Sequence, residues 1–327
     1  MPLERVAVIG AGAWGTALAQ AAASAGRTVT LVARDPAVVE TINTRHRNPA
    51  YLGDLALSPA IRAAGAFDGN ADFLILAVPA QASRAVLAEL GPVRLDRRPV
   101  ILSAKGLEHR TLARQSEILA AVAPTALPFV LSGPSFAEDV AAARPTAVTL
   151  AGEDPELTDA LAAALAGPSF RPYAAGDIIG VELAGGLKNV YALACGAVEG
   201  AGLGASARSA LLARAFAELS RLVVALGGQA ATLTGLAGLG DLTLTCTSVQ
   251  SRNYRYGIAL GRGAGALAEG TIGLAEGVFT APAAQALAHK LGIDAPLIDA
   301  VNLLLDHRAQ IGEIVAALMA RPLKREE

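Results

Sequence analysis

The chain has 327 residues, more than a single hydrophobic core usually organises, so we expect two domains. Its net charge of −2 supplies no basic surface field, which argues against nucleic acid as a partner. Two cysteines inside apolar stretches, a start that runs directly from Met1 into an apolar strand, and the lack of an uninterrupted apolar run of ~18 residues predict a cytoplasmic protein with reduced thiols and no membrane span.

The first half of the chain alternates short β-branched runs with helical patterns. RVAVIG (5–10) precedes a helix from about Trp14, and TVTLVA (28–33) precedes a helix from Pro36. Further strands are expected at residues 73–78, 99–104, 129–133, 146–152 and 170–175. Apolar strands separated by helices predict a mainly parallel sheet that is covered on both faces.

The second half shows helical patterns almost throughout. We therefore expect an α/β fold with an N-terminal Rossmann-type domain at residues 1–178 and an all-α C-terminal domain at residues 179–327. LTLTCTS (242–248) alternates with period two, which alone favours a strand. It follows Asp241, a residue able to cap a helix, in a region with no obvious strand to pair with. We therefore predict a helix there.

The first strand opens into GAGAWG (10–15), which fits the pattern G-x-G-x-x-G. A bare match is weak, but this one follows a strand and begins a helix within a βαβ unit, as pyrophosphate binding requires. Gly10 would make the turn, Gly12 would let backbone N–H groups approach the phosphates, and Gly15 would pack the helix against the strand. The alternative is a glycine-rich turn without a ligand.

The end of the second strand bears on the choice of nicotinamide cofactor. An acidic residue there binds the free ribose hydroxyl, whereas an arginine binds the 2′-phosphate. Asp35 before Pro36 is a good N-cap, so its carboxylate is expected to be used in capping, which leaves Arg34 free for a phosphate. This favours NADP, with NAD tolerated because Asp35 can still turn to the ribose.

Two further strand ends carry polar groups. SAKGLE (103–108) places Lys105 at the carboxyl edge of the sheet, where ligands of open α/β sheets bind. SGPSF (132–136) turns from a strand into a helix with Ser135 at the expected N-cap, and backbone donors there can bind an anion or a carbonyl oxygen. The alternatives are an exposed lysine and an ordinary capped helix.

One lysine stands among glycines, alanines and large apolar side chains in LAGGLKNVYALAC (183–195). In a helix no acidic residue lies one turn from Lys188, so the side chain is expected to be partly buried. Poor hydration lowers a lysine pKa towards neutrality, where proton exchange with a hydroxyl is efficient. The alternative is a lysine whose stem packs while its ammonium reaches water.

The search for other catalytic groups leaves Lys188 as the best candidate for an acid/base. The four histidines lie in polar or charged segments typical of a surface, and neither a Ser-His-Asp order nor a metal-ligand cluster emerges. A last polar cluster lies in GLGDLTLTCTSVQSRN (238–253) and contains Asp241, Thr245, Ser251, Arg252 and Asn253. Arg252 is a suitable fork for a phosphate group, and an exposed turn is the alternative.

Taken together, these residues resemble the bacterial NAD(P)-dependent glycerol-3-phosphate dehydrogenases. The resemblance covers nearly the whole chain through motifs in this order: GAGAWGTALA, AKGLE, SGPSFAEDVA, IIGVELAGGLKNVYALACG, GLAGLGDLTLTCTSVQSRN and AEGV. It implies an oxidoreductase that reversibly reduces dihydroxyacetone phosphate to sn-glycerol 3-phosphate, the headgroup precursor for phospholipids. The cofactor implied is NADP or NAD, and no metal is implied.

The resemblance also implies roles for individual residues. Lys188 would be the proton donor and acceptor, and the adjacent Asn189 would orient it. The substrate-binding residues would be Lys105, Gly133, Ser135, Lys188, Asp241, Ser251, Arg252 and Asn253. With the glycine turn, the cofactor-binding residues would be Gly10, Gly12, Ala13, Trp14, Gly15, Arg34, Lys105, Ala137, Arg252, Leu274 and Glu276.

The sequence departs from the family pattern at four places. Ala13 stands where serine is common, and Gly53 stands where the family usually has proline. Leu274-Ala275 replaces a pair of valines, and Ser206 replaces an asparagine. None of these changes removes a catalytic group, so they bear on cofactor affinity more than on the type of reaction.

Two other functions compete with this interpretation. A β-hydroxyacid-type dehydrogenase shares the Rossmann domain, the helical domain and a lysine–asparagine pair, but it needs a carboxylate anchor in place of a phosphate fork. A non-catalytic dinucleotide-sensing protein would leave Lys188, Asp241 and Arg252 unexplained. The apolar helical half can supply a dimer surface, and we expect a homodimer that acts on a small phosphate substrate.

Overall fold

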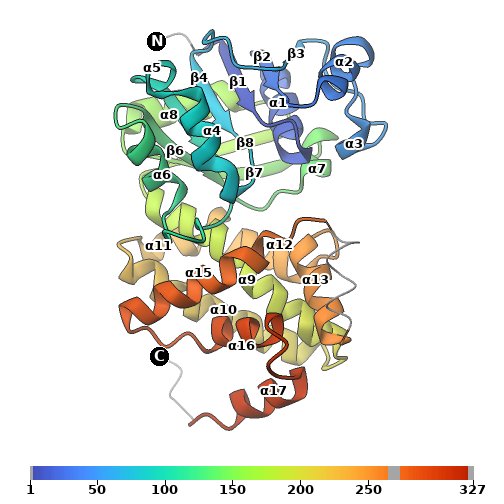
Figure 1. The fold of residues 1–327 in the computed structure, drawn as a ribbon, viewed down its shortest axis with the longest axis vertical. Helices are drawn as coiled ribbons and strands as arrows, with labels where there is room; N and C mark the ends of the chain where they lie inside the picture. The colour runs from blue at the N-terminus through green and yellow to red at the C-terminus, as the bar shows by residue number, and fades with distance from the viewer. Residues whose placement is uncertain (1–2, 264–272, 323–327) are drawn as a thin grey trace.

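The computed structural model describes residues 3–263 and 273–322, and it stacks a sheet with flanking helices on a helical bundle (Figure 1). The sheet has eight strands in the order β3-β2-β1-β4-β5-β6-β7-β8. The strands are β1 Arg5–Ile9, β2 Thr28–Val32, β3 Ile61–Ala64, β4 Phe73–Leu76, β5 Pro99–Leu102, β6 Leu127–Ser132, β7 Thr146–Gly152 and β8 Phe170–Ala175. The predicted mainly parallel sheet is confirmed.

The strand order reverses at β1: β2 and β3 lie on one side of β1, and β4 to β8 lie on the other. β1 pairs in parallel with β2 on one side and with β4 on the other. In open α/β sheets a ligand crevice lies beyond the carboxyl ends of the strands at such a reversal. The glycine turn that follows β1 therefore lies at the expected ligand-binding edge.

Alternate residues of β1 face two different apolar cores. Val6 and Val8 belong to the core that packs on α1, α7 and α8, whereas Ala7 and Ile9 belong to the core that packs on α4, α5 and α6. Both faces of the sheet are thus covered, as predicted. The helices of this part are α1 Ala13–Ser24, α2 Pro36–Arg45, α3 Pro49–Leu52, the 3₁₀ helix η1 Ala80–Ala82, α4 Ser83–Leu90, α5 Pro92–Leu95, α6 Gln115–Val122, α7 Ala137–Ala141 and α8 Pro155–Leu165.

Two features of the sheet differ from the sequence analysis. β3 was not predicted, because its four residues IRAA are few and include the exposed Arg62. β7 runs antiparallel to β6, with Phe129 opposite Gly152. The helix between these two strands, α7, has only 5 residues and is too short to carry the chain back along a strand for a parallel crossover.

The helical part is built around α9 (Ile178–Gly200), which is buried along almost its whole length. The other described elements are α10 Ala205–Ala225, α11 Ala230–Leu233, the π-helix η2 Leu236–Gly240, α12 Asp241–Thr247, α13 Arg252–Gly261, α15 Glu276–Leu291, α16 Pro296–Leu305 and α17 Ile311–Met319. Among the described residues no strand follows β8, so the all-α second half is confirmed. α9 is also the one described helix long and apolar enough to cross a membrane, but 94% of that apolar window is buried inside the protein, as in a core helix.

α9 and α13 cross with their backbones in close contact. A Cβ atom on Gly196 would lie 2.1 Å from the carbonyl oxygen of Tyr254, and one on Gly257 would lie 2.1 Å from the carbonyl oxygen of Leu193. Close contacts of this kind occur at four glycines: Gly196, Gly200, Gly257 and Gly261. Because only glycine fits there, the crossing fixes where α13 begins relative to α9.

The segment LTLTCTS forms α12, so the predicted helix is confirmed despite its period-two pattern. Asp241 does not cap this helix, although its sequence context allows that role. Gly240 occupies the N-cap position, and the Asp241 side chain is fully buried and turns towards two lysines instead. The buried Asp241 carboxylate therefore brings Lys105 and Lys188 together in one site.

Candidate active site

The Lys188 side chain lies where α9 meets α12 and the residue is only 5% exposed. Its ammonium donates hydrogen bonds to a carboxylate oxygen of Asp241 and, over 2.8 Å, to Oγ1 of Thr245. Burial lowers the pKa of Lys188 to about 7, because the charged form loses hydration; Asp241 opposes this shift and Lys105 adds to it. Lys188 is therefore a group that can both give and take a proton near neutral pH.

Asp241 joins two lysines from different parts of the fold. Its second carboxylate oxygen accepts a hydrogen bond of 2.9 Å from Nζ of Lys105, which follows β5 at the carboxyl edge of the sheet. Lys105 also donates to the carbonyl oxygen of Gly133, over 3.2 Å. One carboxylate thus connects the sheet edge to α9 through α12.

Two glycines in α9 allow this close approach. A Cβ atom on Gly185 would lie 2.4 Å from Oγ of Ser132, at the end of β6. A Cβ atom on Gly186 would lie 3.3 Å from the backbone of Gly106. The GG pair, which stands just before Lys188 in the sequence, therefore lets α9 pack directly on the strand ends that carry Lys105 and Gly133.

The side-chain amides of Asn189 and Asn253 form a hydrogen-bond network beside the two lysines. Nδ2 of Asn189 donates to the carbonyl oxygen of Lys105 over 3.2 Å, and Nδ2 of Asn253 donates to Oδ1 of Asn189 over 3.0 Å. Oδ1 of Asn253 in turn accepts from N–H of Gly277 over 2.9 Å. These bonds join the loop after β5 to α9, α13 and α15.

The first turn of α13 presents an exposed cation, and among the described residues no acceptor faces the backbone N–H groups of Arg252 and Asn253. Ser251 is its N-cap, with the hydroxyl accepting from N–H of Tyr254 over 3.2 Å. Arg252 is exposed at the next position, and its charge interacts with the carboxylate of Glu276. A helix N-terminus with an arginine is suited to an anion such as phosphate.

The SGPSF turn is placed differently from the prediction at one residue. Ser135 does not cap α7, because Phe136 holds the N-cap position and Oγ of Ser135 donates to the carbonyl oxygen of Gly133 over 3.0 Å. Gly133 adopts a φ of +147°, and a Cβ there would lie 2.8 Å from Cα of Val148. Ser135 lines a groove of about 430 Å³ that also has Leu244 and Gln250 from the helical part in its wall.

The glycine turn fits a dinucleotide. Gly10 has a φ of +108°, and a Cβ there would lie 2.7 Å from the carbonyl oxygen of Ala77. A Cβ on Gly15 would lie 1.8 Å from the carbonyl oxygen of Gly10, so this glycine is needed for the helix to pack on the turn. Around Gly12, in contrast, a Cβ meets nothing within 4 Å, which leaves the space that a pyrophosphate needs.

The residues after β2 have the predicted geometry. Asp35 is the N-cap of α2, and its carboxylate accepts from N–H of Ala37 over 2.9 Å. Arg34 is exposed beside it. In the first turn of α1, the Trp14 ring lies 5.9 Å from the ammonium of Lys105, which connects the glycine turn to the pair of lysines.

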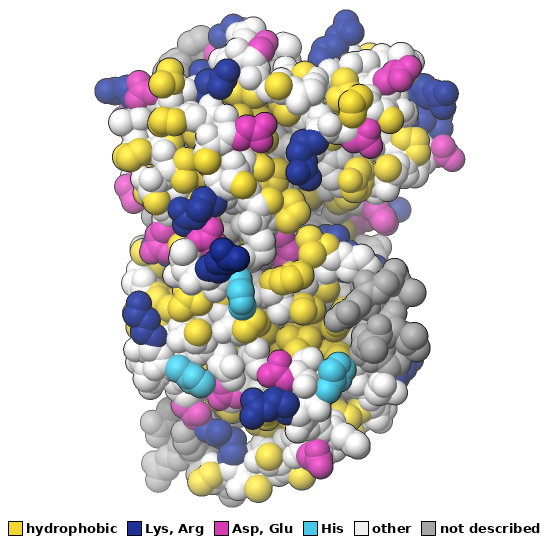
Figure 2. Space-filling model, viewed as in Figure 1, with side chains coloured by type: hydrophobic (Ala, Val, Ile, Leu, Met, Phe, Trp, Pro, Cys, Tyr) yellow, Lys and Arg dark blue, Asp and Glu magenta, His cyan; other side chains and the backbone are white. Residues whose placement is uncertain are grey.

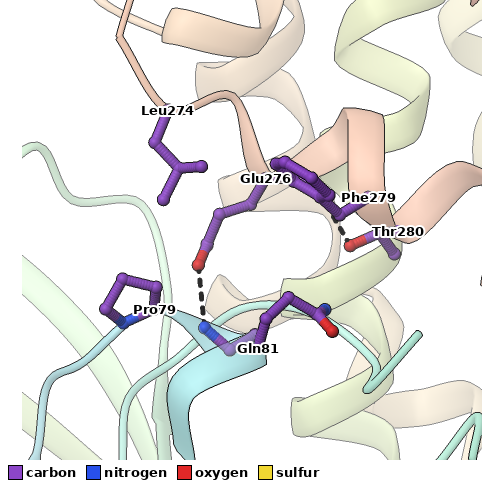
Figure 3. A pocket seen from close by; sticks show the side chains of 7 residues that line it. Pro79, Gln81, Leu274, Glu276, Phe279 and Thr280 are labelled. Atoms are coloured by element: carbon purple, nitrogen blue, oxygen red, sulfur yellow. Dashed lines mark hydrogen bonds between the residues drawn. The ribbon is translucent and has the colours of Figure 1, made fainter. Parts of the chain in front are cut away.

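A small pocket of about 130 Å³ lies between η1 and the start of α15 (Figure 3). Leu274, Glu276 and Phe279 enter it from one side, and Pro79 and Gln81 from the other (Figure 3). The Glu276 carboxylate accepts from N–H of Ala80 over 3.1 Å, and burial raises its pKa. The visible face carries apolar side chains around the junction of the two parts (Figure 2).

The structure thus gathers most of the expected substrate-binding residues around one junction. Lys105, Gly133, Lys188 and Asp241 are linked by hydrogen bonds, and Asn253 is connected to them through Asn189. Thr245 was noted in the sequence but was not assigned to the site. Its position four residues after Asp241 on one helix face is the signal that could have placed it there.

A Rossmann-type sheet with an open glycine turn, next to a buried lysine of near-neutral pKa, is typical of a nicotinamide-dependent oxidoreductase. Within residues 3–263 and 273–322, no cluster of three or more His, Cys, Asp or Glu side chains is arranged to hold a metal ion.

Family models place the chain among known proteins. Residues 5–158 match the N-terminal model, and residues 177–316 the C-terminal model, of NAD-dependent glycerol-3-phosphate dehydrogenase. The chain belongs to this family and is therefore an NAD(P)-dependent oxidoreductase.

Individual relatives agree with the family models over the whole length. The chain is 51% identical to glycerol-3-phosphate dehydrogenase [NAD(P)+] of Caulobacter vibrioides, with 100% of both chains covered. It is also 51% identical to the protein of the same name from Brucella ovis, with 99% of each covered. The crystal structure of glycerol-3-phosphate dehydrogenase from Coxiella burnetii matches with a TM-score of 0.92 at 37% identity, over 97% of this chain and 99% of that one.

Proposed function

We propose that this chain reversibly reduces dihydroxyacetone phosphate to sn-glycerol 3-phosphate with NADPH or NADH, and so supplies the headgroup precursor for phospholipids. The observation that carries the proposal is the buried Lys188 ammonium held by Asp241 at the junction of the two parts. The names of the two bacterial relatives support the choice of substrate.

Lys188 is the general acid and base of the proposed reaction. It donates a proton to the carbonyl oxygen during reduction and removes it from the hydroxyl during oxidation. The nicotinamide cofactor supplies the hydride when bound. A pKa of about 7 keeps both forms of Lys188 populated at neutral pH, and the bonds to Asp241 and Thr245 fix the direction of the ammonium.

The substrate phosphate is proposed to bind at the start of α13, where Arg252 and the free N–H groups converge. Lys105 faces the reacting end of the substrate, since it shares Asp241 with Lys188. The full set of proposed substrate-binding residues is Lys105, Gly133, Ser135, Lys188, Asp241, Ser251, Arg252 and Asn253.

The cofactor is proposed to lie along the carboxyl edge of the sheet, from the glycine turn to the pocket at η1. Arg34 meets the 2′-phosphate, because Asp35 is occupied in capping α2. This supports NADP as the preferred cofactor. The full set of cofactor-binding residues is Gly10, Gly12, Ala13, Trp14, Gly15, Arg34, Lys105, Ala137, Arg252, Leu274 and Glu276.

The organisation of the chain follows from the same proposal. We place the domain boundary at residues 178–179, which is one residue into α9 and shortly after the end of β8 at Ala175. We also propose that the protein is a cytoplasmic homodimer.

The test is to follow oxidation of NADPH and of NADH with dihydroxyacetone phosphate, with unphosphorylated dihydroxyacetone, and with β-keto acids. Rapid turnover with the phosphorylated ketone alone supports the proposal. Turnover with a keto acid instead points to a β-hydroxyacid-type dehydrogenase. Cofactor binding without turnover of any keto substrate points to a dinucleotide-sensing protein.

A further inference from the structure

Asn48 is a buried amide that bonds the glycine turn at Ala11, although it comes 37 residues after Ala11 in the chain. Its relative exposure is 1%. It stands between α2 and α3, in a segment that contacts Thr16 and Gln20 of α1. Neither the sequence motifs nor the proposed sites include it.

The amide nitrogen of Asn48 makes two hydrogen bonds. It donates to the carbonyl oxygen of Ala11 over 2.9 Å and to Oγ1 of Thr16 over 2.8 Å. Because a carbonyl oxygen only accepts, the atom facing Ala11 must be the nitrogen, and both of its hydrogens are engaged. The Thr16 hydroxyl also lies 3.4 Å from the same carbonyl oxygen, so the three groups form a closed triangle.

The Ala11 carbonyl and the Gly12 N–H belong to one planar trans peptide and point in opposite directions. When Asn48 holds the carbonyl inward, it therefore directs the Gly12 N–H outward. Gly12 is the N-cap of α1, and its outer side is open, with nothing within 4 Å of an added Cβ. This is the N–H that a pyrophosphate approaches in a dinucleotide turn.

The segment that carries Asn48 is anchored independently of the turn. N–H of Ser58 donates to Oε1 of Gln20 over 2.8 Å, and N–H of Leu57 donates to the carbonyl oxygen of His46 over 2.8 Å. Leu52 and Leu57 are buried in the core beside α1. The loop that carries Asn48 is therefore fixed by its own contacts, and it holds the Asn48 amide against Ala11.

We propose that Asn48 is a positioning residue for the nicotinamide cofactor: it sets the affinity for the pyrophosphate by orienting the Ala11–Gly12 peptide, without touching the cofactor. The proposal rests on the glycine turn being the cofactor site. It predicts an effect on cofactor affinity that is separate from substrate affinity and from the chemical step.

The test compares Asn48→Asp and Asn48→Ala with Asn43→Asp. Asn43 is a matched control, because its amide also bonds backbone, to both N–H and C=O of Ala63, but on the β3 side of α2. The dissociation constant for NADPH is measured by calorimetry without substrate, and the melting temperature is measured without cofactor. At saturating NADPH, kcat and KM for dihydroxyacetone phosphate are then recorded.

We expect Asn48→Ala to weaken NADPH binding by roughly 5- to 10-fold, as for the loss of one hydrogen bond from the Gly12 N–H to the pyrophosphate. Asn48→Asp should weaken NADPH binding more, because a carboxylate oxygen then faces the Ala11 carbonyl oxygen near the anion. kcat and substrate KM at saturating cofactor should stay near those of the wild type, and Asn43→Asp should leave NADPH binding unchanged. Asn48→Ser, which keeps a donor, should lose less affinity than Asn48→Ala.

Wild-type affinity in Asn48→Ala, or an equal loss in Asn43→Asp, overturns the proposal. If Asn48→Asp does not fold, the Ala and Ser variants still decide the question. Failure of the wild type to bind NADPH or NADH would refute the cofactor site itself, and this outcome is distinct from normal binding by both wild type and variants.

Discussion

Asp241 accepts a hydrogen bond from Lys188 although 53 positions separate them, and both side chains are almost completely buried. Without the Asp241 carboxylate, burial would lower the pKa of Lys188 further. The contact therefore sets how readily the Lys188 ammonium releases its proton. The catalytic proposal depends on this contact, and the first two predictions test it.

Replacing Lys188 with alanine should remove the acid/base and little else. We expect kcat to fall roughly 100- to 10,000-fold, while the dissociation constant for NADPH stays near that of the wild type. Steady-state kinetics and a cofactor titration measure both quantities. Turnover at the wild-type rate would show that Lys188 is not the proton donor.

The two directions of the reaction should depend on pH in opposite ways. Reduction needs the protonated amine, so its kcat should decline as the pH rises through about 7, whereas oxidation needs the neutral amine and should become faster over the same range. Asp241→Asn removes the charge that raises the Lys188 pKa, so the midpoint for reduction should move to lower pH. A midpoint that moves to higher pH, or does not move, contradicts this assignment.

Arg252→Ala should raise KM for dihydroxyacetone phosphate by roughly 10- to 100-fold, as for a lost charge-assisted contact to phosphate. The control is Arg255→Ala on the same helix, whose guanidinium bonds the carbonyl oxygen of Val249 instead. KM should remain near normal in the control. Equal KM values in the two variants would exclude Arg252 as the phosphate anchor.

Arg34→Ala should weaken NADPH and leave NADH nearly unaffected, because only NADPH carries the 2′-phosphate. Comparing kcat/KM for the two cofactors in wild type and variant measures the effect directly. A parallel loss for both cofactors would mean that Arg34 supports the fold after β2 rather than selecting the phosphate.

Gly257→Ala should disturb the crossing of α9 and α13, since the added Cβ would lie 2.1 Å from the Leu193 carbonyl oxygen. We expect a loss of about 1–3 kcal/mol in the free energy of unfolding, with a higher KM for substrate because the start of α13 shifts. Gly312→Ala in α17 is the control, because its Cβ meets nothing within 4 Å. Denaturant unfolding of both variants decides whether the crossing is as tight as described.

Patterns within a short stretch of chain predicted the fold well. The glycine turn, the Asp35 cap and the long apolar helix each depend on neighbours in sequence, so their geometry follows from local rules. The antiparallel β7 was missed because strand direction depends on how far α7 can carry the chain.

Local sequence patterns identified candidate residues of the site one at a time, but they did not show which of these residues contact each other. The lack of an acid near Lys188 along its own helix correctly indicated burial, but the acid that does pair with it comes from α12. The local sequence of Asp241 suggested only a possible helix cap, and it was the resemblance to the dehydrogenase family that placed Asp241 in one site with Lys105 and Lys188. Contacts between distant segments such as these arise only when the sheet edge packs on α9.

The close crossing of α9 and α13 also has an evolutionary consequence. Its four glycines carry no side chain for chemistry, yet a Cβ atom added to any of them would lie 2.1 Å from a backbone carbonyl oxygen of the facing helix. Selection should therefore remove substitutions at these four positions as strictly as at the residues that take part in the reaction. A saturation mutagenesis screen would find intolerance there, in a part of the protein that no inventory of ligand contacts would single out.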